Sequence, residues 1–513
     1  MLTFAKIFVV SCCLAAALTP LVRRVSVWVG LLDHPDVGRK IHTHPIPLGG
    51  GIVVLAGFLG TLAVMLLMSR AVASELFAVP TFTVGFVIAS VGICLLGVCD
   101  DRFTIRGRQK LVGQLIVSSC VVGSGLLITD IRVFALDVDL GILAVPFTLF
   151  WILAAINAMN LIDGMDGLAT SVGLVLSVGI AAMAVSTGHR VDAMLAMALA
   201  GSLAGFLFYN SPPASMFLGD AGSMLIGLVL GVLSIRSCLK GPATAVMAAP
   251  VALLAIPFFD VTMAILRRKL TGRSIYAADR SHFHHYLLQR GFSSRTTVLI
   301  LGGLSCVMTV SAVLSVYRGN EWLATGAVLT VSALLVISGL FGRSECLLLL
   351  KRIKLVALSL TRLKREGHVA TEISAQLRGE REWGDLWETL TVYAASCGLA
   401  SIRLHLYVPE LNEDFHASWQ SDQRLSQTHL WTAEIPLVAC GGPIGTLAIG
   451  GVLSHAQVSV SVSEVIQGLK PFETELVDLV ESAVANTDDQ EMQGRQPNWN
   501  GDWSRSLASR AGE

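Results

Sequence analysis

Five short polar clusters interrupt a chain whose residues are 53% hydrophobic and only 14% charged. They contain carboxylates, an amide and many basic side chains, but no Ser-His-Asp or Cys-His pairing for nucleophilic catalysis. Such an inventory favours chemistry on phosphate groups. The clusters are GRKIHTHPIPLGGG at 38–51, GVCDDRFTIRGRQK at 97–110, NAMNLIDGMDGLA at 157–169, FLGDAGS at 217–223 and RRKLTGRSIYAADRSHFHHYLLQRGFS at 267–293.

The acidic and amide side chains suit magnesium, a hard cation that proteins hold with one or two carboxylates and substrate phosphate oxygens. Lys40 and the arginines between 267 and 280 could neutralise phosphate charge. In phosphoryl transfer the protein mainly positions groups and stabilises developing charge. The clusters therefore predict a site for a diphosphate, with Mg²⁺ as cofactor and Mn²⁺ as the alternative cation.

Three acids also have a purely structural interpretation. Asp100 and Asp101 are adjacent, as acids at a helix end often are. Neighbours on a helix point about 100° apart, so we expect these two to serve different partners. Asp220 could simply cap the start of the next helix.

The third cluster allows two conformations. Asn160, Asp163 and Asp166 lie on one face if the segment is helical. Gly164 and Gly167 equally favour a tight loop.

His282, His284 and His285 could form a zinc site, but no fourth closely spaced Cys or His ligand accompanies them. The ten cysteines include no CxxC pair, so we interpret them as small buried hydrophobes. A net charge of zero argues against a nucleic-acid partner.

The elements that position these clusters are apolar runs near the roughly 20 residues that a bilayer helix needs. The first run is followed by Arg23 and Arg24, which favours a retained span with its N-terminus outside over a signal peptide. We therefore predict a multi-pass α-helical membrane protein with about eleven transmembrane helices. The predicted spans lie at about 3–22, 48–69, 80–99, 112–129, 142–160, 167–187, 191–209, 215–235, 245–266, 296–316 and 321–341.

Alternate loops of such a chain share one side of the membrane, and all five clusters fall on the same side. The loops on this side also carry most of the lysines and arginines, which places them in the cytoplasm by the positive-inside rule. The sequence thus predicts a single cytoplasmic site at the mouth of a bilayer. That position favours one water-soluble phosphate substrate and one lipid-borne substrate.

The composition changes near Gly342, where residues become charged and mixed. We predict a membrane domain at 1–342, a cytoplasmic soluble α+β domain at 343–486 and a disordered tail at 487–513. Within the soluble domain we expect a helix at about 369–397, strands at 401–408, 431–439 and 444–452, and a closing helix at about 462–486. No catalytic constellation occurs there.

The five motifs, in this order between these spans, resemble the polyprenyl-phosphate N-acetylhexosamine-1-phosphate transferase superfamily. It includes the enzymes that start enterobacterial common antigen, O-antigen and wall teichoic acid, and phospho-N-acetylmuramoyl-pentapeptide transferase. The similarity covers about residues 1–342, and the C-terminal domain, at most similar to GAF or PAS domains, lies outside the family's common core.

The resemblance implies roles for individual residues. Asp220 matches the Mg²⁺ ligand, and Asn160 matches a position that supports metal or nucleotide binding. Asp163 and Asp166 match nucleotide-site acids, and Phe217 sits where an aromatic ring can stack on uracil. The remaining matches concern phosphate: Asp100 or Asp101 for the lipid phosphate, and Lys40, Arg280, His282, His284 and His285 for phosphate and substrate handling.

By the same resemblance, the chain transfers N-acetylhexosamine 1-phosphate from a UDP-sugar to polyprenyl (undecaprenyl) phosphate in the bacterial cytoplasmic (inner) membrane, releasing UMP. A direct attack by the lipid phosphate is favoured, with a covalent phospho-aspartate route as the alternative. Phe283 interrupts the histidines, as in the N-acetylhexosamine branch, so N-acetylglucosamine or an epimer is expected. The pentapeptide branch, a lipid-linked sugar transporter and a membrane-anchored regulator stay open, and a homodimer is compatible with all of them.

Overall fold

The computed structural model describes residues 2–34, 44–134, 136–238, 244–271, 282–350, 353, 371–378, 383–408, 411, 413–421, 430–452 and 465–494. The chain divides into two compact units. One comprises Met1–Lys269 with Ser274–Arg343, and the other comprises Leu270–Arg273 with Ser344–Glu513.

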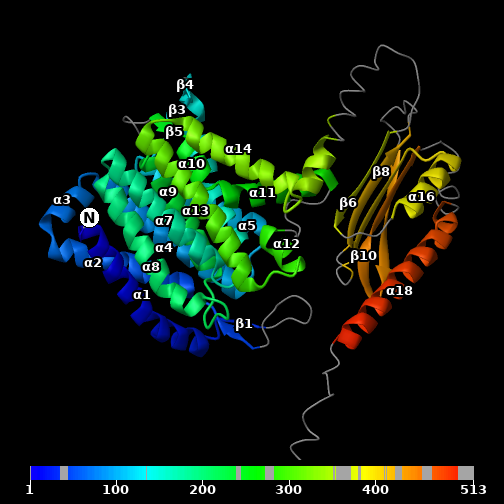
Figure 1. Ribbon diagram of the computed structural model, residues 1–513, viewed down its shortest axis with the longest axis horizontal. Coiled ribbons are helices and arrows are strands. Elements are labelled where there is room, and N and C mark those ends of the chain that lie inside the picture. The colour runs from blue at the N-terminus through cyan, green and yellow to red at the C-terminus, as the bar shows by residue number, and fades with distance from the viewer. Residues whose placement is uncertain are drawn as a thin grey trace, which may run out of the picture. The chain divides into compact units, whose positions relative to one another are not determined.

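The first unit is almost entirely helical (Figure 1). Helix α9 lies at its centre, because it packs against α2, α4, α6 and α7 and its residues from Ala221 to Ile235 are all buried. The other elements in chain order are α1 (Leu2–Val29), α2 (Gly50–Met68), α3 (Arg70–Leu76), α4 (Pro80–Phe103), α5 (Gly107–Gly123), η1 (Gly141–Leu143), α6 (Ala144–Ile162), α7 (Leu168–Thr187), α8 (Arg190–Asn210), α9 (Gly219–Arg236), α10 (Ala248–Leu253), α11 (Ala255–Thr271), α12 (Phe283–Gln289), α13 (Ser294–Arg318) and α14 (Glu321–Ile337).

Within the described residues, eight helices are long and apolar enough to cross a membrane: α1, α2, α4, α6 with η1, α7, α8, α9 and α13. The prediction of a multi-pass helical membrane protein is confirmed at this level. Helices α5, α11 and α14 occupy the other three predicted spans but have only 17 residues each. At 1.5 Å per residue each is about 26 Å long, somewhat less than a hydrocarbon core of about 30 Å. The count of eleven therefore stays a prediction.

Two small sheets accompany the helices. Strands β1 (Leu32–Asp33) and β2 (Ile46–Pro47) pair antiparallel just before α2. Strands β3 (Asp130–Val133), β4 (Leu136–Asp139) and β5 (Thr244–Val246) form a three-stranded sheet in the order β4-β3-β5. We call residues 217–220, which lead into the N-terminal end of α9, the FLGD loop. Strand β5 follows the C-terminal end of α9, so the second sheet lies at the opposite end of this helix.

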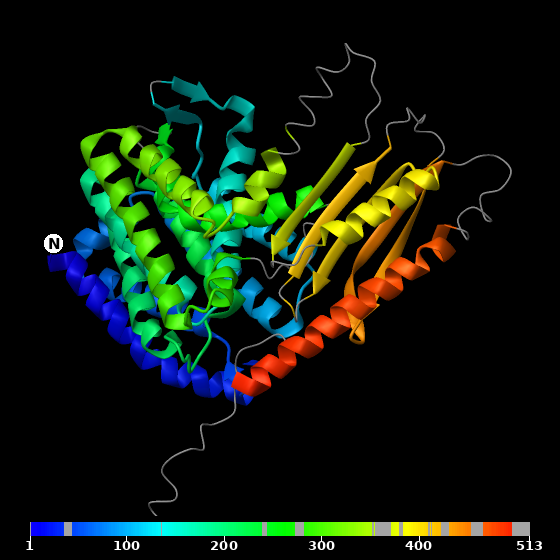
Figure 2. The same cartoon turned by 45° about the vertical axis from the view of Figure 1, so that its right-hand side comes forward.

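The second unit contains a five-stranded antiparallel sheet in the order β6-β8-β7-β10-β9. Alternate residues of β7, from Ile402 to Val408, are buried in one core with residues of α16 and α18, such as Trp387 and Leu476. Figure 2 shows these two helices crossing the same face of the sheet. The bounds are β6 (Thr371–Arg378), α16 (Gly384–Ser396), β7 (Ser401–Val408), β8 (Glu413–Gln420), β9 (Leu430–Ala439), β10 (Gly442–Val452) and α18 (Lys470–Gly494).

The predicted helix at 369–397 is wrong over its first part. Residues Thr371–Arg378 form strand β6, which pairs with β8, and the helix begins only at Gly384. The physical reason is that a neighbouring strand satisfies the backbone groups of β6, which a local pattern does not reveal. Strand β8 was not predicted, and α18 continues to Gly494, beyond the predicted start of the tail.

Candidate active site

The ends of four helices bring together two carboxylates, an amide and an ammonium group, which we call the acidic centre. It consists of Asp100 on α4, Lys110 on α5, Asn160 on α6 and Asp220 on α9. The Lys110 Nζ lies 2.8 Å from Asp100 Oδ2 and 2.8 Å from Asp220 Oδ2. It also donates to Asn160 Oδ1 at 3.0 Å. Three of the predicted clusters thus meet at one point.

Three further hydrogen bonds fix the side chains of the centre in place. The Asn160 Nδ2 donates to Asp220 Oδ1 at 2.6 Å and to Ser223 Oγ at 2.9 Å. The second oxygen of Asp100 accepts from the Ile105 backbone N–H at 2.8 Å. Asp100 is only 8% exposed, and a buried charge of this kind needs a partner, which Lys110 supplies.

Asp101 makes a different set of contacts from its neighbour, as expected for adjacent residues on a helix. Its carboxylate accepts from the backbone N–H groups of Asp220 at 2.9 Å and Ala221 at 3.4 Å. These groups belong to the first turn of α9, which has no helical acceptor for them. Asp101, a residue of α4, therefore caps the N-terminus of α9. The structural interpretation predicted Asp220 as this cap, but Asp220 lies inside the helix.

Close packing of α4 on α9 makes this arrangement possible. A Cβ atom at Gly97 would collide with the backbone of Ala221, so only glycine permits the approach. The glycine run after β2 supports the same loop from the other side. The Gly50 and Gly51 N–H groups donate to the carbonyls of Phe217 and Leu218, each at 3.0 Å. These glycines position the FLGD loop through their backbone.

The 163–167 segment is a tight loop between α6 and α7, so the helical alternative for the third cluster is wrong. The Asp166 Oδ2 accepts from the Ala214 N–H at 2.9 Å and ties this loop to the segment before α9. Burial raises the pKa of Asp163 well above its usual value, and the nearby carboxylates of Asp220, Asp101 and Asp166 add to this effect. Asp163 thus adds a third carboxyl group next to the acidic centre, and its buried environment disfavours the charged form.

The histidine cluster begins the short helix α12 and lies against this loop. A Cβ atom at Gly164 would collide with the imidazole of His284, which places the two segments in direct contact. Burial lowers the pKa of His284 well below its usual value, and the neighbouring His285 and His282 contribute. His284 is therefore a neutral, 1% exposed side chain whose ring nitrogens have no hydrogen-bond partner among the described residues.

His282 is held by Asp260 of α11, which sequence reasoning missed. The His282 Nδ1 lies 3.1 Å from Asp260 Oδ2, and the Phe283 N–H donates to Asp260 Oδ1 at 2.9 Å. One carboxylate therefore both orients an imidazole and caps α12. Its signal was an acid inside an otherwise apolar run, which is costly without a function.

Lys110 is the second residue that sequence reasoning missed, although it lies within the second cluster. Its signal was a lysine at the start of a helix, ten residues after Asp100.

Two predicted residues, Lys40 and Arg280, fall outside the described residues. Phe217 is half-buried, and its predicted stacking on a uracil stays a prediction.

The donor set of the acidic centre fits Mg²⁺. Two carboxylates and an amide oxygen surround one ammonium group. Mg²⁺ prefers such oxygen ligands and completes its shell with water and substrate phosphate. Among the described residues, no group of three or more His, Cys, Asp or Glu side chains is placed so that it could hold a metal ion.

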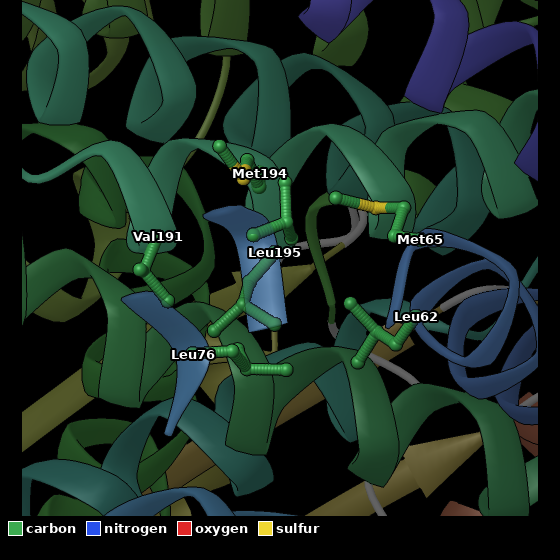
Figure 3. A pocket seen from close by; sticks show the side chains of 7 residues that line it. Leu62, Met65, Leu76, Val191, Met194 and Leu195 are labelled. Atoms are coloured by element: carbon green, nitrogen blue, oxygen red, sulfur yellow. The ribbon is translucent and has the colours of Figure 1, made fainter. Parts of the chain in front are cut away.

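A small apolar pocket lies between α2, α3 and α8 and differs in character from the acidic centre. Figure 3 shows its aliphatic lining, which includes Leu62, Leu76 and Leu195. These residues lie toward the C-terminal end of α2 and the N-terminal end of α8, away from the acidic centre. The pocket offers no group for a phosphate.

Comparison with known proteins supports a common origin. Residues 83–238, which contain the whole acidic centre, match the family described as glycosyl transferase family 4. A Bacillus subtilis (strain 168) protein described as a probable undecaprenyl-phosphate N-acetylglucosaminyl 1-phosphate transferase is 35% identical over 315 residues, covering 61% of this chain and 85% of the relative. A decaprenyl-phosphate N-acetylglucosaminephosphotransferase of Mycobacterium tuberculosis (strain ATCC 25618 / H37Rv) is 32% identical over 308 residues, covering 55% and 74%. A phospho-N-acetylmuramoyl-pentapeptide-transferase of Clostridium kluyveri (strain NBRC 12016) is 31% identical over 281 residues, covering 51% and 81%.

Proposed function

The chain belongs to glycosyl transferase family 4, and from this premise we propose that it is a polyprenyl-phosphate N-acetylhexosamine-1-phosphate transferase. It transfers the sugar 1-phosphate of a UDP-N-acetylhexosamine to a polyprenyl phosphate and releases UMP. One observation carries this proposal: Asp100, Asn160 and Asp220 of three different motifs converge on Lys110 in a chain that is 35% identical to a relative named for this transfer.

The sugar is N-acetylglucosamine. The relatives from Bacillus subtilis and Mycobacterium tuberculosis are named for N-acetylglucosaminyl phosphate transfer and align over more of this chain than the pentapeptide transferase does. The lipid acceptor is undecaprenyl phosphate or a close polyprenyl analogue. The transfer starts a cell-surface polysaccharide.

The residues of the acidic centre hold the diphosphate end of the UDP-sugar. Asp220, Asp100 and Asn160 would hold Mg²⁺ through their oxygens, with Asp220 as the principal ligand. When bound, the ion neutralises charge on the diphosphate and favours departure of UMP. The Lys110 ammonium then remains beside the same oxygens as a donor for a phosphate group.

The reaction itself is a displacement at phosphorus. A lipid phosphate oxygen forms a bond to the β-phosphorus, the bond from that phosphorus to the bridging oxygen breaks, and UMP leaves with the electron pair. A phosphate monoester has a second pKa near 6, so its oxygen is mostly ionised at neutral pH and needs little help from a base. Asp101 positions Asp220 by capping α9.

The membrane supplies the lipid substrate and sets the orientation. We place α5, α11 and α14 beside the eight longer helices as spans, which completes eleven and puts the acidic centre at the cytoplasmic mouth. The basic ends of α5 and α11 support this side. Single-cysteine labelling in intact cells and in inverted vesicles, at positions before α5 and after α3, tests the orientation.

The activity is tested with full-length protein purified in detergent. UMP release is measured with UDP-N-acetylglucosamine, undecaprenyl phosphate and Mg²⁺, with each component omitted in turn. We expect release only when all three are present, and none with UDP-N-acetylmuramoyl-pentapeptide. Release from the pentapeptide substrate alone would assign the chain to the other branch, and release from neither would overturn the proposed function.

A further inference from the structure

The chain that follows α14 packs against the helix that carries the histidines. Phe341 is 3% exposed, and its ring stacks on that of Phe283 with a centroid distance of 4.7 Å and an interplanar angle of 13°. It also meets Phe259 of α11 edge-on at 5.8 Å and Tyr286 of α12 at 6.4 Å. Phe341 is therefore inserted between α11 and α12.

A polar contact fixes the same segment two residues earlier. The Gly339 carbonyl accepts from Arg290 Nη2 at 2.7 Å and from Tyr286 Oη at 3.1 Å. The guanidinium of Arg290 also lies over the Tyr286 ring, 4.8 Å from its centroid. Both donors belong to α12 or its C-cap, so this carbonyl holds the end of α12 opposite to the histidines.

The backbone of the segment is itself anchored. The N–H groups of Gly339 and Phe341 donate to Val336 and Leu335 of α14 at 3.1 Å each, and Gly339 has the left-handed φ of 66° that such a helix end requires. The position of Phe341 is therefore set by α14. A side chain held in this way resists displacement of whatever packs on it.

Two of the three ring partners of Phe341, Phe283 and Phe259, are directly connected to the histidines. Phe283 is the residue between His282 and His284, and its backbone N–H is bound by Asp260. Phe259 precedes Asp260, which also holds His282 Nδ1. On the other side, His284 contacts the loop at Gly164. Helix α12 thus lies between the 338–342 segment and the acid-bearing loop.

We propose that residues 338–342 form a clamp in which Phe341 and the Gly339 carbonyl act as positioning groups for His282 and His284. The clamp touches no substrate. It fixes the place of α12, and through α12 it sets the distance of the imidazoles from the loop that carries Asp163. This inference rests on the proposed function, because its kinetic consequence is measured on the transfer reaction.

The test uses the full-length protein with two kinds of readout. In Phe341→Ala we expect kcat to fall at least about tenfold, with the KM for the UDP-sugar changed less than about threefold. The amides of α12 should exchange hydrogen at least about tenfold faster. Phe341→Leu keeps most of the apolar volume and should recover most of the turnover. Ile337→Ala, an exposed position four residues earlier, is the matched control and should match the wild type.

Arg290→Met keeps the proposal testable if Phe341→Ala does not fold. Arg290 is exposed, and the change removes the contact with the Gly339 carbonyl without opening the core. We expect kcat to fall about threefold and hydrogen exchange of the α12 amides to become about threefold faster. Unchanged exchange in α12 for both folded variants would overturn the clamp, whatever the activity. Absence of UMP release by the wild type would instead overturn the proposed function, while exchange would still decide on the clamp.

Discussion

Adjacent acids on one helix turn serve two different helices. Asp100 faces Lys110, whereas Asp101 binds the first backbone N–H groups of α9. The helical geometry of neighbouring residues predicts this division. Its consequence is that Asp101 helps to place Asp220, because it holds the backbone N–H of that residue.

Asp220→Asn tests the principal ligand of the proposed Mg²⁺ site. The change removes a charged oxygen from the centre but keeps the size of the side chain. We expect turnover below about a tenth of the wild-type value even at saturating Mg²⁺. The measurement is UMP release, with the exposed Asp137→Asn as a control that retains full activity. Turnover near the wild-type level would remove Asp220 from this role.

Lys110→Met separates the ammonium group from the metal. Without its charge, the carboxylates of Asp100 and Asp220 face each other uncompensated. We expect a lower melting temperature in metal-free buffer, and a larger stabilisation by Mg²⁺ than in the wild type, because the ion relieves this repulsion. Thermal unfolding with and without Mg²⁺ measures both, and Lys6→Met on the exposed part of α1 is the control. Equal Mg²⁺ shifts in variant and wild type would contradict the prediction.

The neutral state of His284 predicts a pH dependence of stability. Because the folded pKa lies well below the ordinary value of about 6.5, the unfolded chain binds the proton more readily. The contribution of His284 to stability is thus intact above about pH 6.5 and is lost as the pH falls toward the folded pKa. We expect His284→Gln to flatten the decline in melting temperature between about pH 7 and pH 5. Identical slopes for the two proteins would show that His284 is not buried in the neutral form.

At the residue scale, the sequence predicts the kinds of side chain at the site better than their contacts. Asp100, Asn160 and Asp220 were predicted and meet within hydrogen-bond distance of one lysine. Lys110 looked like an ordinary basic residue of a cytoplasmic loop, and Asp260 lay inside an apolar run. Their importance depends on helices that are distant in sequence, so no local pattern reveals it. Lys40 and Arg280 keep their predicted roles as predictions.

At the scale of elements, glycines decide how closely the helices that form the site approach. Gly97→Ala places a Cβ atom against the backbone of Ala221, and neither helix can move without shifting Asp100 or Asp220. We expect a loss of at least about 2 kcal/mol of stability or failure to fold. Thermal unfolding measures it, and Gly302→Ala on α13, where a Cβ atom would meet nothing within 4 Å, is the control. A fully stable Gly97→Ala protein would show that α4 and α9 are less closely packed.

The elements that the sequence mispredicts are those fixed by distant partners. The longer apolar helices follow from apolar length, which is a local property, and most of their ends lie within about four residues of the predicted ones. The larger differences are at α1, which continues to Val29, at α5, which begins and ends five to six residues early, and at α11, which begins only at Ala255. The segment TEISAQLR, strand β6, has only a weak alternation of apolar and polar residues, and its pairing with β8 makes it a strand. At 163–167 the sequence permits two conformations, because the glycines favour a loop and the spacing of Asn160, Asp163 and Asp166 favours a helix.

At the scale of the whole molecule, the chemistry and the C-terminal unit are separable along the chain. Every residue of the acidic centre, the histidine helix and the clamp belongs to the first unit, and the second unit, apart from Leu270–Arg273, begins at Ser344. The second unit has its own buried core, built from the sheet with α16 and α18. We infer that the second unit regulates or recruits.

Two truncations test this separation and place its boundary. A chain that ends at Arg343 keeps Gly339 and Phe341 and should retain at least about a third of the full-length turnover. A chain that ends at Ile337 loses both clamp groups and should lose at least about nine-tenths of it. The proteins are purified in one detergent, checked for monodisperse elution, and compared by UMP release. If the chain ending at Arg343 folds but is inactive, the C-terminal unit belongs to the catalytic machinery. If both truncations are equally active, the segment at 338–342 is not needed to hold the histidine helix, since the only residues that differ between them are those of the clamp and Arg343.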